Sequence, residues 1–204
     1  MVKNILSELR GHAPFTAFGA STGIIIMVLI LVFDISSGIS ESLFEAFHPI
    51  HVLLSAIATT AMYKLHASGK LWKAALIGYT GSIGIATLSD CIIPYVGELM
   101  IGLPDPHPHI GFIEKWWIVN PLALAGIAIG YLRPVTRFPH AGHVLISAWA
   151  SLFHITMALE ESLDWILVIP IFIFLILAVL VPCCTSDIVY PLLFSSEHEH
   201  GHAH

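Results

Sequence analysis

Three short motifs occur twice in this chain, in the same order in both halves. The central motif reads His-x-x-His-Val-Leu; it begins at His48 and again 92 positions later at His140. A Pro-x-x-x-x-Gly-x-x-x-Gly motif precedes each copy and a Ser-Asp-x-x-x-Pro motif follows it. The motifs start at Pro14, His48 and Ser89 in the first half and at Pro121, His140 and Ser186 in the second. Three motifs in one order indicate an internal duplication, which restricts the fold to two related units.

The composition is that of a membrane protein. Of the 204 residues, 56% are hydrophobic and 11% are charged, and the mean hydropathy is +0.85. A soluble domain keeps roughly a quarter of its residues charged, so most of this surface must face lipid. We therefore expect one integral domain whose main partner is the lipid bilayer. The sequence has no room for an ATP-binding module and no basic cluster for nucleic acid.

Six stretches are long and apolar enough to cross a bilayer, whose hydrocarbon core takes about 20 helical residues. They cover residues 15–33, 49–65, 71–93, 116–132, 141–159 and 165–184. We therefore expect an all-α, polytopic integral membrane protein with six transmembrane helices. The duplication divides them into a first three-helix repeat at 1–103 and a second at 104–194, followed by a His-rich cytoplasmic tail at 195–204.

The basic residues predict the orientation of these helices. Seven of the eight lie in the N-terminal segment or in the connections after the second and fourth spans: Lys3, Arg10, Lys64, Lys70, Lys73, Arg133 and Arg137. The opposite side receives Lys115 and most of the acidic loop residues. Because cytoplasmic loops are rich in Lys and Arg, we expect a multi-pass protein of the cell (inner or plasma) membrane with both termini in the cytoplasm.

An odd number of spans per repeat inverts the second repeat relative to the first, as in many secondary transporters. In the first repeat the HxxH pair then begins the second span at the outer side, where Asp90 ends the third span. In the second repeat the HxxH pair and Asp187 take the corresponding places at the inner side. The spacing predicts two clusters on opposite membrane faces. Whether they stay apart or converge near the midplane depends on how the helices break around Pro94 and Pro191.

Each cluster combines residue types that bind transition metals. Residues at positions i and i+3 share one helix face, so both imidazoles of an HxxH pair can reach a common point. Two imidazole nitrogens and a carboxylate oxygen suit a divalent zinc, manganese, nickel, cobalt or iron ion. The predicted metal ligands are His48, His51 and Asp90 in the first repeat and His140, His143 and Asp187 in the second. Ser89 and Ser186 are expected to hold the adjacent aspartates by hydrogen bonds.

Other polar residues carry weaker signals. Cys91, Cys183 and Cys184 flank the Ser-Asp motifs and are interpreted as small apolar filler, with a soft metal ligand near Asp187 as the alternative. His154 has Met62 as its counterpart in the first half and is expected to be a hydrogen-bonded core histidine. The alternating histidines of the tail at 195–204 are typical of a flexible, weak metal-binding segment, which supports a metal connection independently of the HxxH pairs.

These observations favour a secondary transporter or exporter of a divalent transition-metal ion, with the two clusters exposed in turn. Protonation of the histidines would couple metal movement to a proton gradient, because ligands must be deprotonated to bind. The alternatives are a membrane-embedded metal-dependent hydrolase, a proton-relay transporter of a metal-free substrate, and a subunit that binds metal only to fold. An enzyme needs one competent site, so two intact copies favour transport. The glycine-rich faces of the first and fourth spans could also pack between protomers, which would form a homodimer.

Overall fold

The computed structural model describes residues 2–33, 36–66, 70–134, 137–159, 165–184 and 190–194; within these ranges the side chains of 2–13, 66, 137–141, 165, 184 and 192–193 are not described. Every element in the described ranges is helical. In chain order the elements are α1 (Val2–Val32), α2 (Ser37–His66), α3 (Leu71–Thr87), the π-helical turn η1 (Leu88–Ile92), α4 (Ile93–Ile101), α5 (Gly111–Glu114), α6 (Trp116–Leu132), α7 (Arg137–Met157), the 3-10 turn η2 (Trp165–Leu167), α8 (Val168–Cys184) and α9 (Tyr190–Leu193).

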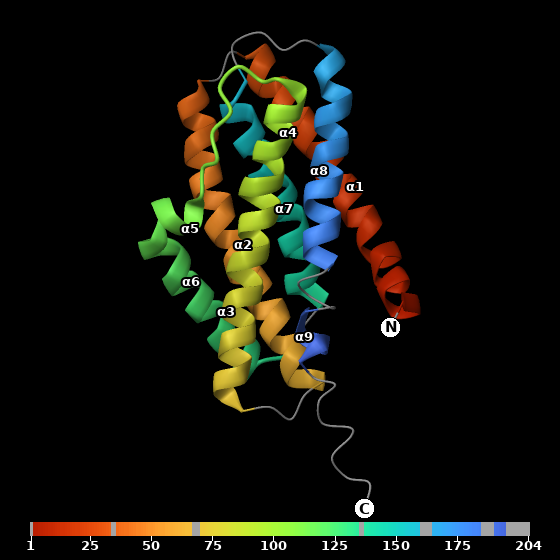
Figure 1. Ribbon diagram of the computed structural model, residues 1–204, viewed down its shortest axis with the longest axis vertical. Helices are drawn as coiled ribbons and strands as arrows, with labels where there is room; N and C mark the ends of the chain where they lie inside the picture. Colours follow the sequence, from red (N-terminus) through yellow and green to blue (C-terminus); the bar gives the residue numbers. More distant parts are fainter. Residues whose placement is uncertain are drawn as a thin grey trace, which may run out of the picture.

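The long helices lie side by side along the long axis of the molecule (Figure 1). At the centre α2 packs against α7, and the two run in opposite directions. The helices α3 and α6 pack on α2, whereas α1 and α8 pack on α7. After α4 the chain passes back along the bundle to α5, so that α6 begins about half-way down the molecule. The central pair α2 and α7 carries both HxxH motifs.

Among the described residues, three helical segments are long and apolar enough to cross a membrane: Pro14–Val32, Ser37–Leu65 and Leu71–Ile101. Two shorter apolar helices cover Trp116–Leu132 and Val168–Cys183. Large apolar side chains point outward from them, including Phe18 and Ile25 on α1 and Val181 on α8, each more than half exposed. Soluble monomers rarely expose a continuous apolar face of this kind, so the outer surface of the bundle is suited to lipid.

The helices that carry the first HxxH pair and Asp90 extend beyond their predicted spans. The second span was predicted to begin at residue 49, but α2 begins at Ser37 because its first turns bury Ser40 and Phe44 while Glu41 stays exposed. This stretch is an amphipathic helix that is too polar on average to be read as part of a span. The third span was predicted to end at residue 93, but η1 and α4 continue the helix to Ile101. The HxxH pair and Asp90 therefore lie well inside their helices rather than at the ends.

The repeated glycine motifs pack α1 and α6 against the central helices. A Cβ placed on Gly19 of α1 would lie 2.9 Å from the Cβ of Ala148 on α7. A Cβ placed on Gly126 of α6 would lie 2.8 Å from the Cβ of Ala56 on α2 and 2.5 Å from the backbone oxygen of Leu53. Ala56 and Ala148 are 92 positions apart, as the HxxH motifs are. The glycines that could have served a contact between protomers are thus used within one chain.

The contact at Gly126 predicts a position that tolerates no side chain. Gly126→Ala should lower the free energy of unfolding by about 1–3 kcal/mol, because the added methyl group meets backbone that cannot rotate away. The matched control is Gly84→Ala on α3, where no atom lies within 4 Å of the added Cβ. There alanine should leave stability unchanged or raise it by about 0.5–1 kcal/mol. Thermal unfolding of both variants in detergent tests this, and equal melting temperatures for Gly126→Ala and the wild type would contradict the packing.

Candidate functional site

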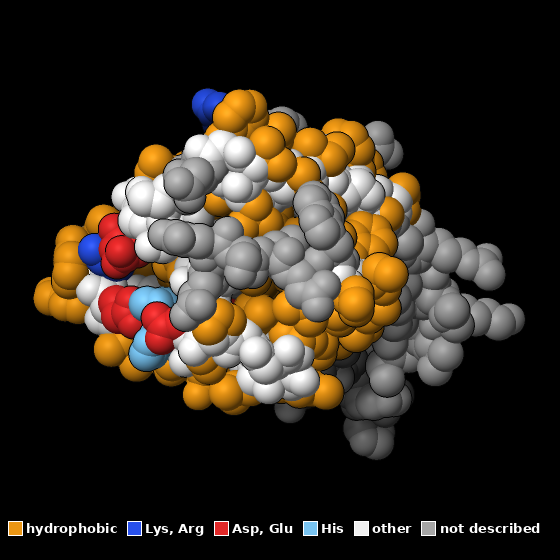
Figure 2. Space-filling view, turned by 90° about the horizontal axis from the view of Figure 1, so that it is seen from above, with side chains coloured by type: hydrophobic (Ala, Val, Ile, Leu, Met, Phe, Trp, Pro, Cys, Tyr) orange, Lys and Arg blue, Asp and Glu red, His pale blue; other side chains and the backbone are white. Residues whose placement is uncertain are grey.

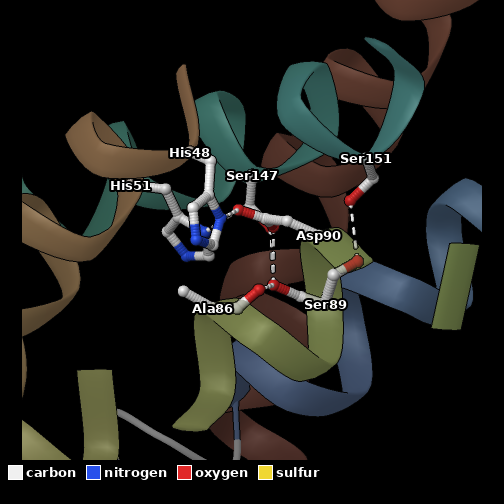
Figure 3. Close-up of polar contacts among 7 residues, drawn as sticks. All are labelled: His48, His51, Ala86, Ser89, Asp90, Ser147 and Ser151. Carbon is white, nitrogen blue, oxygen red and sulfur yellow. Dashed lines mark hydrogen bonds and ion pairs between the residues drawn. The ribbon is translucent and has the colours of Figure 1, made fainter. Parts of the chain in front are cut away.

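A single buried carboxylate gathers side chains from α2, η1 and α7. Oδ2 of Asp90 lies 3.0 Å from Nδ1 of His48 and 2.7 Å from Nδ1 of His51. Oδ1 of Asp90 accepts hydrogen bonds from Oγ of Ser89 at 2.7 Å and from Oγ of Ser147 at 2.9 Å. Figure 3 shows the two rings turned toward the carboxylate and Ser147 meeting it from the neighbouring helix. The structure thus brings together His48, His51, Asp90 and Ser89, which the sequence grouped in one predicted site.

These contacts determine the chemical state of the two imidazoles. Asp90 is fully buried, and a buried carboxylate is tolerated only where donors reach its oxygens. For His48 and His51 to donate, the hydrogen of each neutral ring must sit on Nδ1, which leaves Nε2 as an acceptor with a free lone pair. Both Nε2 atoms are buried and have no hydrogen-bond partner among the described residues. The carboxylate therefore fixes the orientation of both imidazoles and leaves the lone pair of each neutral ring on Nε2.

The second HxxH motif meets the first at this point. The rings of His51 and His143 are stacked, with centroids 5.6 Å apart and planes 4° from parallel. His51, His143 and Cys183 each offer a ligand atom, and these atoms lie within 4.8 Å of one another. The sequence left open whether the two clusters stay apart or converge, and the contact between His51 and His143 brings the two motifs together where α2 and α7 pack. Cys183 also packs with Val144, Ala148 and Val179, so its position fits both the interpretation as apolar filler and the alternative of a soft metal ligand.

The other predicted site residues lie outside what the structure describes. The backbone of His140 belongs to α7, but its side chain is not among the described ones. Ser186 and Asp187 fall in the undescribed segment between α8 and α9. Their predicted roles therefore remain predictions.

A proline and a π-helical turn place Asp90. Ile93 donates its backbone N–H to the carbonyl of Leu88, five residues back. The next bond in that register would join Pro94 to the carbonyl of Ser89, but proline has no N–H. Oγ of Ser151 on α7 donates to this carbonyl instead, at 2.9 Å. The turn that carries Asp90 is thus held to α7 by its backbone as well as by its side chain.

The first residue of α5, Gly111, covers the ring of His48. A Cβ placed on Gly111 would lie 2.5 Å from Cδ2 and 2.9 Å from Nε2 of His48. Only a residue without a side chain lets the backbone approach the ring so closely. Gly111 therefore closes the site on the side that bears the free nitrogen of His48.

Three residues that position the site had no assigned role in the sequence interpretation. Ser147 and Ser151 follow His143 at intervals of four residues, so a helical reading places all three on one face. That spacing is the signal by which they could have been found. Gly111 could not have been found in this way, because no pattern in the sequence links it to His48.

Comparisons with protein-family models, with curated protein sequences and with solved structures found no match for this chain.

Replacing Asp90 tests whether the four hydrogen bonds hold the helices together. Asp90→Asn keeps the shape but turns one acceptor oxygen into an NH2 group, so two of the four donors lose their acceptor. A buried donor without a partner costs about 1–3 kcal/mol, and the free energy of unfolding should fall by at least about 2 kcal/mol. The measurement is denaturant unfolding of the protein in mixed micelles.

The matched control is Asp105→Asn, a carboxylate that is 68% exposed. Its effect should stay within about 0.5 kcal/mol, as is usual for surface substitutions. Equal losses of stability in the two variants would show that Asp90 does not organise the site.

Proposed function

We propose that this protein is a secondary transporter of a divalent transition-metal ion. The observation that supports the proposal most is the pairing of Asp90 with Nδ1 of both His48 and His51, which leaves their buried Nε2 atoms without a partner in the described part of the chain. Histidines that bind metals almost always donate the other ring N–H to a carboxylate, a carbonyl or water. The imidazoles are therefore oriented before an ion arrives. In this proposal Asp90 orients ligands and does not bind the metal directly.

The substrate ion would bind where the two HxxH motifs meet. His51, His143 and Cys183 supply two nitrogens and one sulfur within 4.8 Å of one another. Imidazole with thiolate suits zinc, cobalt or iron, whereas manganese prefers oxygen ligands. By analogy with the first motif, we propose that Asp187 orients His140 and His143 and that Ser186 holds Asp187 as Ser89 holds Asp90.

The glycine contacts support two inverted three-helix repeats at 1–103 and 104–194. The first helix of each half packs on the second helix of the other half, with Gly19 against Ala148 and Gly126 against Ala56. The helices α2 and α7 run in opposite directions (Figure 1). These relations are expected if α1, α2 and α3–α4 correspond to α6, α7 and α8–α9 through an axis in the membrane plane. Six helices would then cross the bilayer.

Charge supports a cell-membrane location with both termini in the cytoplasm. Figure 2 views the upper end of the bundle and shows acidic and histidine side chains gathered at one side of an otherwise largely apolar surface. Ion pairs join His107 to Asp105 at 2.8 Å in the loop before α5 and Lys115 to Glu45 at 2.5 Å at the start of α6. The bond to Glu45 raises the pKa of Lys115. We propose that this acidic end faces outward and attracts cations, while the basic connections face the cytoplasm.

Transport would follow from movement of one half against the other. The stacked rings of His51 and His143 lie between helices of different halves. Rocking of the halves would separate or join these rings and expose the ion to each side in turn.

Metal content provides the first test of the proposal. The protein shortened after Phe194, so that the histidine-rich tail cannot contribute, should purify with a stoichiometric amount of transition metal or acquire it from zinc. The double variant His51→Ala/His143→Ala should bind none, because two of the close donors are gone. His107→Ala, which removes an imidazole that is 59% exposed, is the matched control and should keep the metal. Metal retained in the double variant would disprove this location.

Flux measurements then separate transport from catalysis. In liposomes that contain a zinc indicator, the wild type should move Zn²⁺ and the double variant should move at least tenfold less. A protein that binds metal at this site but moves none would instead indicate a membrane-embedded metalloenzyme. If neither protein binds metal, the histidines and Asp90 are better explained as a proton relay.

A further inference from the structure

A second buried carboxylate–imidazole pair lies between α4 and α7. Oε1 of Glu98 is 2.7 Å from Nδ1 of His154, and both residues are only 1% exposed. Oε2 of Glu98 and Nε2 of His154 have no hydrogen-bond partner among the described residues. His154 was expected to be a hydrogen-bonded core histidine, and of its two ring nitrogens only Nδ1 has a hydrogen-bond partner among the described residues. A membrane protein seldom keeps two such groups buried unless they have a function.

The π-helical turn aligns this pair with the site already described. Asp90 and Glu98 are eight residues apart and contact Ser147 and His154, which are seven apart on α7. Seven residues make about two turns of an α-helix, so the spacing between Asp90 and Glu98 contains one residue more than the spacing on α7. The π-helical turn η1 accommodates this extra residue, because its hydrogen bonds span five residues instead of four. Both carboxylates therefore face α7, separated by about 10 Å along the helix axis.

An aromatic ring separates the pair from the metal-binding histidines. Phe44 stacks on His48 with centroids 5.4 Å apart, and its other contact is edge-on with His154, also at 5.4 Å. Two interacting groups offer too few ligands for a transition metal, which usually takes four. Among the described residues the close three-donor group is His51, His143 and Cys183, and it does not include this pair. The pair is therefore better suited to binding protons than to binding metal.

The outer loop connects the pair to water. The ring of His109 lies 5.7 Å from that of His154 and is 32% exposed, and His107 follows at 5.9 Å with 59% exposed. His109 also lies 3.8 Å from the carboxylate of Glu114. The titratable groups that face the pair are thus His109 with Glu114 on the outer side and His48 beyond Phe44.

On the remaining side, the titratable group among the described residues of α8 is Cys183, which lies with His51 and His143 and not with this pair. Phe174 of α8 packs against Gly97, next to Glu98. Protons can therefore reach the pair from the loop, whereas apolar side chains cover the face toward α8.

We infer that Glu98 and His154 form a proton-exchange site, reached from the outer end through His109, that couples proton movement to metal movement. The carboxylate and the imidazole share one proton, and the free Oε2 and Nε2 atoms are where a second proton binds and leaves. The proton enters from the outer solution, and its single positive charge offsets half of the charge of the divalent metal ion that moves in the opposite direction. This role rests on the proposed transport function, but the binding of the proton does not.

The test compares Glu98→Gln with the wild type in liposomes that contain zinc and pH indicators. A glutamine carbonyl still accepts the N–H of His154, so the variant keeps the bond and removes only the protonatable oxygen. It should bind zinc and exchange zinc for zinc as the wild type does. The proton flux that accompanies zinc should fall at least tenfold, and a pH gradient should no longer drive zinc accumulation.

Two control variants make the result specific. Glu41→Gln changes an exposed glutamate on α2 and should retain full coupling. Glu98→Asp should restore part of the proton flux, which a purely structural role would not predict. Proton flux at the wild-type level in Glu98→Gln would overturn the inference, and so would loss of bound zinc, which would make Glu98 a metal ligand.

Infrared difference spectra between acid and neutral pH separate this inference from the transport proposal. A protonated Glu98 contributes a carboxyl band that should be present in the wild type and in Glu41→Gln and missing from Glu98→Gln. If the wild type moves no zinc but shows this band, the transport proposal fails and the proton-binding pair stands. If the band is the same in all three proteins, the pair does not exchange protons.

Discussion

The buried carboxylate of Asp90 is the constraint on which the rest of the structure depends. A charged group inside an apolar bundle is very costly unless hydrogen-bond donors surround it. Here two imidazoles from α2, the neighbouring Ser89 and Ser147 from α7 supply the donors. Rotating either helix by one residue would swing its donor away by about 100°. The requirement to satisfy one carboxylate therefore sets the positions of three helices that are distant in the sequence.

The π-helical turn transmits this constraint along the bundle. Pro94 removes a backbone donor, and Ser151 of α7 takes its place at the carbonyl of Ser89. The turn also brings Glu98 onto the face of α7, where it meets His154. If the segment from Asp90 to Glu98 were a regular α-helix, Glu98 would lie on a different helix face and point away from α7. One local irregularity thus supports two buried polar contacts, which agrees with the frequent occurrence of π turns at functional positions.

The repeated motifs were sufficient to predict which residues come together. His48, His51, Asp90 and Ser89 form one cluster, as their recurrence indicated. Their positions along the helices were predicted wrongly, because a hydropathy average does not recognise the amphipathic turns that begin α2 at Ser37. The stacking of His51 on His143 could not be predicted either, since helical periodicity states which face a residue occupies but not where two helices cross. Glu98 and His154 have no counterparts in the other half, so the repeat gave no signal for them.

The first helix of each half packs against the second helix of the other half, and this arrangement places the site at the boundary between the halves. Because α1 packs on α7 and α6 packs on α2 through glycines, each half completes the packing of the other. The centre of the molecule is then the contact between α2 and α7, where His51 meets His143. Small residues let these helices approach closely without large interlocking side chains, which would resist sliding. A binding site shared by two halves changes its geometry whenever the halves move. That property distinguishes a site suited to alternating exposure from one that only stabilises a fold.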